Sequence, residues 1–201
     1  MKKNVINFYR KLFKRESNQP NLNYSDNFLK PYLHIGCGDI NLEGWINLDA
    51  RNRDHVHIQT DKLDLVQFAN ESLGVIYLSH VLEHVSFSEA ESILKNFHNK
   101  LRDGGMLLIS VPDFESLVKI YHQPEGNLKL IRKALLGGQD YEYNFHKSVY
   151  DFKFLQELCI NSGFKLAQKY ETTKEFGGEI GDFSTYEING IPVSVNIQAF
   201  K

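Results

Sequence analysis

The chain has 201 residues, of which 42% are hydrophobic and 12% aromatic, and this suits one α/β domain of ordinary size. A formal net charge of −2 argues against a nucleic-acid partner. The two cysteines, Cys37 and Cys159, argue against a disulfide scaffold or a four-cysteine zinc site and suit a reducing compartment. No apolar run approaches the roughly 20 residues that span a bilayer. The basic N-terminus lacks the apolar core of a secretory signal, so we expect a cytoplasmic protein.

The first 15 residues, "MKKNVINFYRKLFKR", form a basic amphipathic segment. The segment carries six positive charges and no acid, and its apolar side chains recur at helical spacing: Val5, Ile6, Tyr9, Leu12 and Phe13. Such a helix either docks on its own domain or on a partner subunit, or lies as a peripheral contact on the inner face of an anionic membrane. Residues 16–30 are polar and predict a linker, which places the folded domain at 31–201.

From residue 31 onward, short apolar runs alternate with helical patterns. Strands are predicted at residues 32–36, 45–49, 56–60, 75–79 and 106–111. The stretch "SFSEAESILKNFHNKL", residues 86–101, predicts a helix with a continuous apolar stripe. A capping box fits its start in two ways, either with Ser86 and Glu89 or with Ser88 and Glu91. This alternation is typical of a doubly wound parallel sheet.

The C-terminal part of the chain follows a different pattern. A helix is predicted at 151–163, and strands at 164–171 and 193–201 have no helix between them, so we expect them to pair antiparallel at one edge of the sheet. Only residues 37–44 separate the first two strands, which is shorter than the dozen residues that a crossover helix needs. The sequence therefore predicts an α/β, Rossmann-like, mostly parallel sheet with an antiparallel C-terminal edge and a shortened first crossover helix.

A glycine turn and an aspartate stand at the ends of the first two strands. Gly36 and Gly38 end the first strand, and their missing side chains let backbone N–H groups approach a ligand closely. Asp49 ends the second strand, where a carboxylate can accept hydrogen bonds from both hydroxyls of a ribose. The alternative is a structural turn followed by a solvated aspartate. Because both features stand at strand ends, the pattern favours a nucleotide-type ligand.

Four motifs in order extend this pattern: "HIGCG", "GWINLD", "YLSHVLEH" and "LRDGGMLLISVPDF", within residues 32–114, with weaker agreement in "HKSVYDFKFLQELCINSGF". With these motifs the chain resembles class I S-adenosylmethionine-dependent methyltransferases. It is most similar to the bacterial subgroup with HxGCG, GWxNxD and SHVLEH motifs, whose members are often associated with cell-surface carbohydrate synthesis. The resemblance implies the Rossmann-like class I fold and S-adenosyl-L-methionine as the cofactor.

The resemblance also implies a role for each matching position. The glycine turn would line the methionine part of the cofactor, and Asp49 would hold the ribose. An acid and a leucine after the third strand would face the adenine. The end of the fourth strand would lie beside the sulfonium. The residues implied are Gly36, Cys37, Gly38, Asp49, Asp61 or Asp64, Leu63 or Leu65, Ser79 and His80. Two positions depart from the wider fold: His34 replaces an acid, and Ile40 replaces a third glycine. The subgroup shares the histidine.

The stretch "HVLEH", residues 80–84, has the H-x-x-E-H spacing of an inverted zinc-protease motif. That motif belongs inside a helix, whereas this one follows a buried strand, and no third ligand is evident in the sequence. We therefore expect no metal. Glu83 and His84 then cap or pack the start of a helix.

Methyl transfer to a hydroxyl or an amine requires a base, and histidine or aspartate is the usual one. The acceptor should enter over the fourth and fifth strands, which nominates His80, Asp113 and His146 as catalytic residues. For each, a structural hydrogen bond is the alternative. Residues 114–150 and 172–192 are the expected substrate lid. The aromatic residues around His146 form either an acceptor wall or core: Tyr141, Tyr143, Phe145 and Tyr150.

The leading hypothesis is a methyltransferase that acts on a hydroxyl of a sugar or a sugar-linked precursor in surface polysaccharide biosynthesis, so its substrate is a small molecule. Two alternatives remain: an N-methyltransferase or other small-molecule methyltransferase, and a non-catalytic scaffold subunit that keeps the cofactor fold. A nicotinamide oxidoreductase is less well supported, because the later glycine of the dinucleotide fingerprint is missing. The oligomeric state is open.

Overall fold

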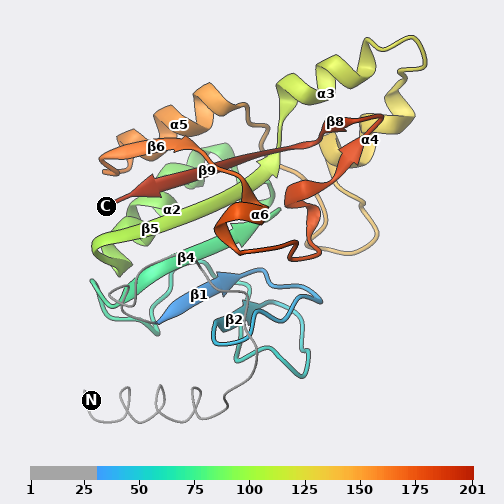
Figure 1. The fold of residues 1–201 in the computed structure, drawn as a ribbon. Helices are drawn as coiled ribbons and strands as arrows, with labels where there is room; N and C mark the ends of the chain where they lie inside the picture. Colours follow the sequence, from blue (N-terminus) through green and yellow to red (C-terminus); the bar gives the residue numbers. More distant parts are fainter. Residues whose placement is uncertain (1–30) are drawn as a thin grey trace.

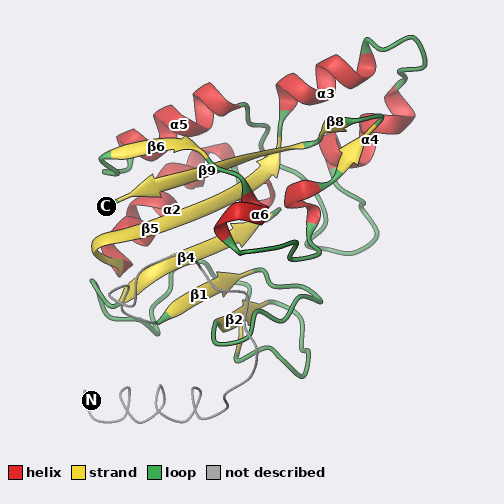
Figure 2. Ribbon diagram, viewed as in Figure 1, coloured by secondary structure: helices red, strands yellow, loops and turns green. Residues whose placement is uncertain are grey.

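The structure is a computed structural model that describes residues 31–201, so the predicted arm (1–15) and linker (16–30) lie outside the described residues. The described chain forms a seven-stranded sheet in the order β3-β2-β1-β4-β5-β9-β6 (Figures 1 and 2). Its strands are β1 (Tyr32–Ile35), β2 (Ile46–Asp49), β3 (Ile58–Gln59), β4 (Leu73–Ser79), β5 (Leu101–Pro112), β6 (Leu166–Lys169) and β9 (Ser194–Phe200).

The strand pairing confirms the predicted mixed sheet. Strands β3, β2, β1, β4 and β5 are parallel, and β9 runs antiparallel to both β5 and β6. The last strand therefore lies one place inside the edge, and β6 is the edge strand. Strand order reverses between β1 and β4, and in open α/β sheets ligands bind at this switch point, beyond the carboxyl ends of the strands.

Helices and short turns complete the fold (Figure 2). They are η1 (Leu82–His84), α2 (Phe87–Lys100), α3 (Phe114–Tyr121), α4 (Leu128–Leu136), α5 (Phe152–Asn161), α6 (Thr172–Glu175) and η2 (Phe183–Thr185). A small hairpin, β7 (Glu187–Ile188) with β8 (Ile191–Pro192), packs against α3 and α4 through apolar side chains. In Figure 1, α3 and α4 extend away from the carboxyl end of β5. No helix within residues 31–201 is long and apolar enough to cross a membrane.

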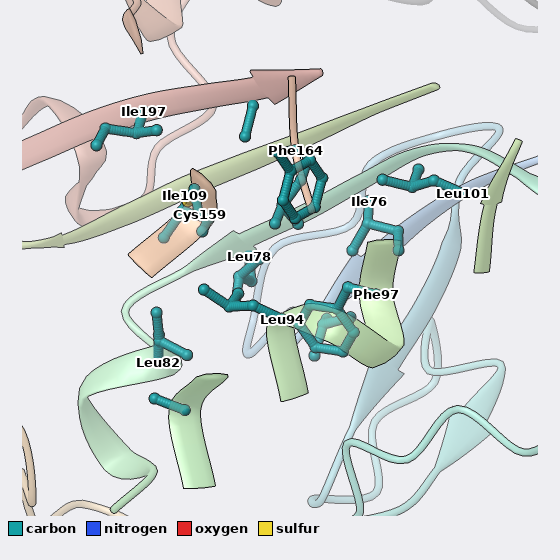
Figure 3. Packing of buried hydrophobic residues seen from close by; sticks show 14 of the residues in the cluster. Ile76, Leu78, Leu82, Leu94, Phe97, Leu101, Ile109, Cys159, Phe164 and Ile197 are labelled. Atoms are coloured by element: carbon teal, nitrogen blue, oxygen red, sulfur yellow. The ribbon is translucent and has the colours of Figure 1, made fainter. Parts of the chain in front are cut away.

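Helices α2 and α5 cover one face of the sheet. The predicted apolar stripe of α2 is buried there, with Leu94 and Phe97 fully covered beside Leu78 of β4 (Figure 3). Helix α2 begins directly after Ser86, so of the two predicted helix starts the structure has the one with Ser86 as the N-cap residue. The Ser86 hydroxyl donates to the Glu89 carboxylate (2.5 Å) and does not accept from the helix backbone, so the reciprocal capping box is not formed.

The opposite face of the sheet carries an aromatic cluster. Trp45 and Tyr77 pack on Phe176 with ring centroids 5.7 and 4.8 Å away, and Tyr32 lies 5.2 Å from Trp45. These rings cover the sheet on the side away from α2 and α5. Aromatic packing of this kind lets a few large side chains bury a face that carries little helix.

The first crossover is shorter than predicted. Residues 36–45, which connect the parallel strands β1 and β2, contain turns and no helix. The N–H groups of Gly36 and Cys37 both donate to the carbonyl of Leu48, at 2.8 and 3.2 Å. These bonds extend the pairing of β1 with β2 beyond the end of β1.

His34 is buried in β1 and should limit stability in acid. Its ring stacks on Tyr77 and is 2% exposed, and burial lowers its pKa from 6.5 to about 4. Between pH 6.5 and about 4 the unfolded chain binds a proton at His34 that the folded chain excludes, so this residue should remove about 3 kcal/mol of stability as the pH falls. We expect chemical denaturation of His34→Phe to show a smaller loss over this range than the parent. Equal losses in both proteins would contradict the assignment.

Candidate active site

A cleft of about 1030 Å³ lies at the carboxyl ends of β1, β2 and β4. Its floor includes the glycine turn and Asp49, and its other walls come from the segments predicted as a lid. From 114–150 the lining residues lie in α4 and the loop after it, and from 172–192 they lie around η2 and β7. The fold thus places both segments beside the end of the sheet where ligands bind in this architecture.

The glycine turn has a backbone shape that requires glycine. Gly36 and Gly38 have φ angles of +64° and +58°, in the left-handed region. A Cβ on Gly36 would stand 2.3 Å from Cγ2 of Val81, so the turn leaves no room for a side chain. The N–H of Gly38 donates to Oδ2 of Asp49 at 2.8 Å. The two features singled out in the sequence are therefore directly joined.

Asp49 is held rigidly and faces the cleft. It is 6% exposed, and its Oδ1 accepts the backbone N–H of Arg51 at 2.8 Å, with the Arg51 guanidinium 3.4 Å away. Oδ1 also accepts a hydrogen bond from Nε of Arg51 at 3.4 Å, whereas Oδ2 accepts only from Gly38 and keeps a lone pair for a ligand hydroxyl. Burial, followed by the charge of Asp49, raises the pKa of Cys37 to about 12. Cys37 therefore lines the cleft as a neutral thiol and not as a nucleophile.

The structure separates the two pairs proposed for the adenine. Asp61 and Leu63 line the cleft, whereas Asp64 and Leu65 do not. Leu65 is fully buried in the core beneath α2, and Asp64 accepts the N–H of Val66. Only the first pair is placed to meet a ligand in the cleft.

Ser79 and His80 line the cleft at the end of β4. His80 has a φ of +55°, which turns the chain sharply into η1. Its Nδ1 lies 3.0 Å from Oε1 of Glu83, and its Nε2 lies 2.9 Å from the Ser194 hydroxyl. Because that hydroxyl donates its single proton to the Phe183 carbonyl, it can only accept from His80. Both ring nitrogens of His80 are thus engaged within the protein.

Asp113 does not reach the cleft. Its carboxylate caps α3, accepting the N–H of Glu115 at 3.3 Å and the hydroxyl of Ser116 at 2.8 Å, and it is 7% exposed. Each oxygen of this carboxylate accepts a hydrogen bond at the start of the helix, as an N-cap aspartate does. The position of Asp113 fits the alternative of a structural hydrogen bond, since the residue does not line the cleft.

His146 lies in the loop after α4 and also lines the cleft. Its Nε2 is 3.8 Å from Oε1 of Glu83, and its ring centroid is 4.8 Å from that of His84. Burial is the main cause that lowers the pKa of His146. Burial by itself would raise the pKa of Glu83. The nearby His80, followed by His84 and His146, outweighs burial and holds that pKa below its usual value. Glu83 is therefore an ionised carboxylate among three histidines.

The aromatic residues near His146 divide into two groups. Tyr141, Tyr143 and Phe145 line the cleft and are 42–44% exposed, whereas Tyr150 is buried in the core beside α5. The acceptor-wall interpretation fits the first three residues, and the core interpretation fits Tyr150.

The sequence analysis missed several residues of the site. Ser194 orients His80, and Val81 contacts the glycine turn, yet neither residue type carries a chemical signal in the sequence. Glu83 was recognised only as a packing or capping residue. Asp182 also lines the cleft and accepts a short hydrogen bond from the hydroxyl of Tyr77, 105 positions away in the sequence. Partners this distant in sequence become visible only when the sheet is assembled.

Comparison with known proteins gives the family. A model described as "Methyltransferase domain" matches residues 24–169. A SAM-dependent methyltransferase from Thermotoga maritima is 15% identical with a TM-score of 0.53, covering 98% of this chain and 89% of its own. A SAM-dependent methyltransferase from Archaeoglobus fulgidus is 17% identical with a TM-score of 0.52, covering 85% of each chain.

A third structure, from Nostoc punctiforme, is 15% identical with a TM-score of 0.46, and its match covers 73% of this chain but only 37% of its own. No curated protein matches significantly. At these identities the structural likeness shows the fold. The family model spans well over half of the chain, from before the glycine turn to beyond His146. The chain therefore belongs to the methyltransferase-domain family and has the fold of SAM-dependent methyltransferases.

Proposed function

We propose that this protein binds S-adenosylmethionine in the cleft and methylates a hydroxyl of a sugar or a sugar-linked small molecule. The observation that carries the proposal is the Gly38–Asp49 hydrogen bond, which joins a glycine turn and a strand-end carboxylate at the floor of one large cleft. The same cleft reaches His84 and His146, so it has room for a cofactor at one end and an acceptor at the other.

The residues present fit the cofactor. Glycine at position 36 lets the turn pack directly against Val81 in a left-handed conformation, and Oδ2 of Asp49 keeps a lone pair for a ribose hydroxyl. Leu63 offers an apolar surface to the adenine, and Asp61 offers an acceptor to its amino group. When bound, S-adenosylmethionine supplies an electrophilic methyl group for an in-line displacement, so the protein mainly has to orient the acceptor.

The acceptor end of the cleft is best placed beside His146. Of the three residues nominated from the sequence, Asp113 caps a helix and His80 has both nitrogens engaged. His146 contacts the Ala134 carbonyl through Nδ1 at 3.0 Å, and its Nε2 has no donor to accept from among the described hydrogen bonds. Of the three nominated residues, His146 is therefore the one with a ring nitrogen free to face an acceptor.

The lining of the acceptor end supports a carbohydrate. Tyr141, Tyr143 and Phe145 present exposed rings to the cleft, and aromatic rings combine an apolar face with a polar edge or tip. The motifs resemble those of proteins associated with surface carbohydrate, which gives the same acceptor class. Two free buried cysteines suit the cytoplasm, where nucleotide-linked sugar precursors and the cofactor would meet.

The first prediction concerns the ribose. Removing the Asp49 carboxylate takes away the ribose acceptor and the partner of Gly38, so we expect Asp49→Ala to bind S-adenosylhomocysteine at least about tenfold more weakly. Titration calorimetry measures this, with Asp64→Ala as the matched control outside the cleft. Equal affinities in the two variants would remove Asp49 from the cofactor site. NADH should not compete.

The second prediction separates Asp61 from Asp64. An aspartate that accepts from the adenine amino group should make the parent protein prefer S-adenosylhomocysteine over its inosine analogue, which has no amino group there. We expect Asp61→Asn to reduce that preference by about tenfold and Asp64→Asn to retain it. If both variants keep the preference, the adenine lies elsewhere in the cleft.

The third prediction concerns the acceptor. Incubation with methyl-labelled cofactor should label sugar or sugar-nucleotide acceptors in a product stable to the conditions that cleave methyl esters. Labelling of amine acceptors alone would replace the hydroxyl proposal with N-methylation. Cofactor binding without transfer to any acceptor in a broad panel would support the scaffold alternative.

A further inference from the structure

We propose that Glu83, His84 and His146 form a binding site for a divalent transition-metal ion at the acceptor end of the cleft. From the sequence we expected no metal, because "HVLEH" showed no third ligand. The fold supplies one. His146, more than 60 positions further along the chain, is brought against Glu83 and His84, and one ligand atom from each of the three residues lies within 4.8 Å of the others.

The three residues are held together by backbone contacts that need no ion. The N–H groups of Lys147 and Ser148 both donate to the carbonyl of Glu83, at 2.7 and 3.1 Å. The Ser148 hydroxyl donates to the carbonyl of Val85 at 2.7 Å. The loop that carries His146 is thus fixed to the turn that carries Glu83 and His84, and the cluster is preformed.

Both histidines are oriented as metal ligands usually are. Nδ1 of His84 lies 3.1 Å from the carbonyl of Phe145, and Nδ1 of His146 lies 3.0 Å from that of Ala134. A carbonyl oxygen can only accept, so each Nδ1 carries the hydrogen and each Nε2 of the neutral ring has a free lone pair. A backbone carbonyl that fixes the tautomer in this way is the common support of a metal-bound histidine.

Glu83 supplies the charge for the site. Its side chain is 1% exposed, and Oε2 has no hydrogen-bond partner among the described residues. Oε1 lies 3.0 Å from Nδ1 of His80 and 3.8 Å from Nε2 of His146. A buried carboxylate with an unused oxygen lacks a cation or donor on that side, and His80 would then act as the supporting partner of the ligand.

The spacing suits a small ion with nitrogen and oxygen ligands. Ligand atoms about 2.1 Å from a tetrahedral ion stand roughly 3.4 Å apart. His146 Nε2 and Glu83 Oε1 are 3.8 Å apart, and the ligand atoms of the cluster lie within 4.8 Å of one another, so side-chain shifts of up to about an ångström would close the site around an ion. Two imidazoles and a carboxylate form the ligand set of catalytic zinc sites and suit Zn²⁺, with Mg²⁺ much weaker. Three protein ligands leave a position open toward the cleft, which His84 and His146 line.

An open position there would bind an oxygen of the acceptor. A bound ion would lower the pKa of an acceptor hydroxyl held at that position, and the hydroxyl proton would be released to water before methylation. This role rests on the proposed function, whereas the binding of the ion does not. The two can therefore be tested apart.

The test is metal binding by the untagged, chelator-treated full-length chain, measured by titration calorimetry with Zn²⁺, Mn²⁺ and Mg²⁺. We expect one tight Zn²⁺ per chain, weaker Mn²⁺ and little Mg²⁺. His84→Asn, at a partly exposed position, should lose at least about tenfold in Zn²⁺ affinity, as should His146→Asn. His122→Asn, at an exposed histidine outside the cluster, is the matched control and should bind as the parent does.

Two further readouts keep the proposal falsifiable. Zn²⁺ should raise the thermal midpoint of the parent and of His122→Asn but not that of His84→Asn. S-adenosylhomocysteine affinity should be the same in all of these proteins, so failure of the cofactor site and failure of the metal site are distinguishable. The proposal is overturned if the parent binds no Zn²⁺, or if His84→Asn and His122→Asn bind it equally. The cluster is then a buried ion pair between Glu83 and His80.

Discussion

The hydrogen bonds that join the end of β1 to the end of β2 determine the rest of the cleft. Gly36 and Cys37 donate to the Leu48 carbonyl, and Gly38 donates to the Asp49 carboxylate. No crossover helix lies between the two strands, and the Asp49 carboxylate points toward the glycine turn. The steric contact between the Gly36 position and Val81 then ties the turn to the segment after β4, which carries His80 and Glu83. The contact between Gly36 and Val81 thus positions the glycine turn relative to His80 and Glu83.

The site combines buried groups of opposite character. His34 lies behind the turn and stays neutral, since burial lowers its pKa to about 4. Glu83 is equally buried, but neighbouring histidines keep its pKa low. Burial shifts each group toward its neutral form. At His34 burial outweighs the charges of Asp182 and Asp49, whereas at Glu83 the contact with His80, 3.0 Å away, outweighs burial.

Local features of the fold and site were predictable from the sequence, and distant contacts were not. The strands, α2 and the antiparallel pairing of β6 with β9 follow from apolar periodicity and glycine positions, and the structure confirms them. The Gly38–Asp49 pair could be anticipated because both residues end neighbouring strands. Asp113 was nominated by its place after β5, but capping of α3 takes up its carboxylate. His146 joins Glu83 and His84 only through loop geometry that no spacing rule encodes.

The central claim is that Asp49 and the glycine turn hold the ribose and methionine parts of the cofactor, with the acceptor end beside His146. A crystal structure of the protein with S-adenosylhomocysteine tests it most directly. The account predicts a ribose hydroxyl within hydrogen-bonding distance of Oδ2 of Asp49, the adenine against Leu63, and the sulfur directed toward the His80–His146 end of the cleft. A ligand bound in another orientation, or outside this cleft, would contradict it.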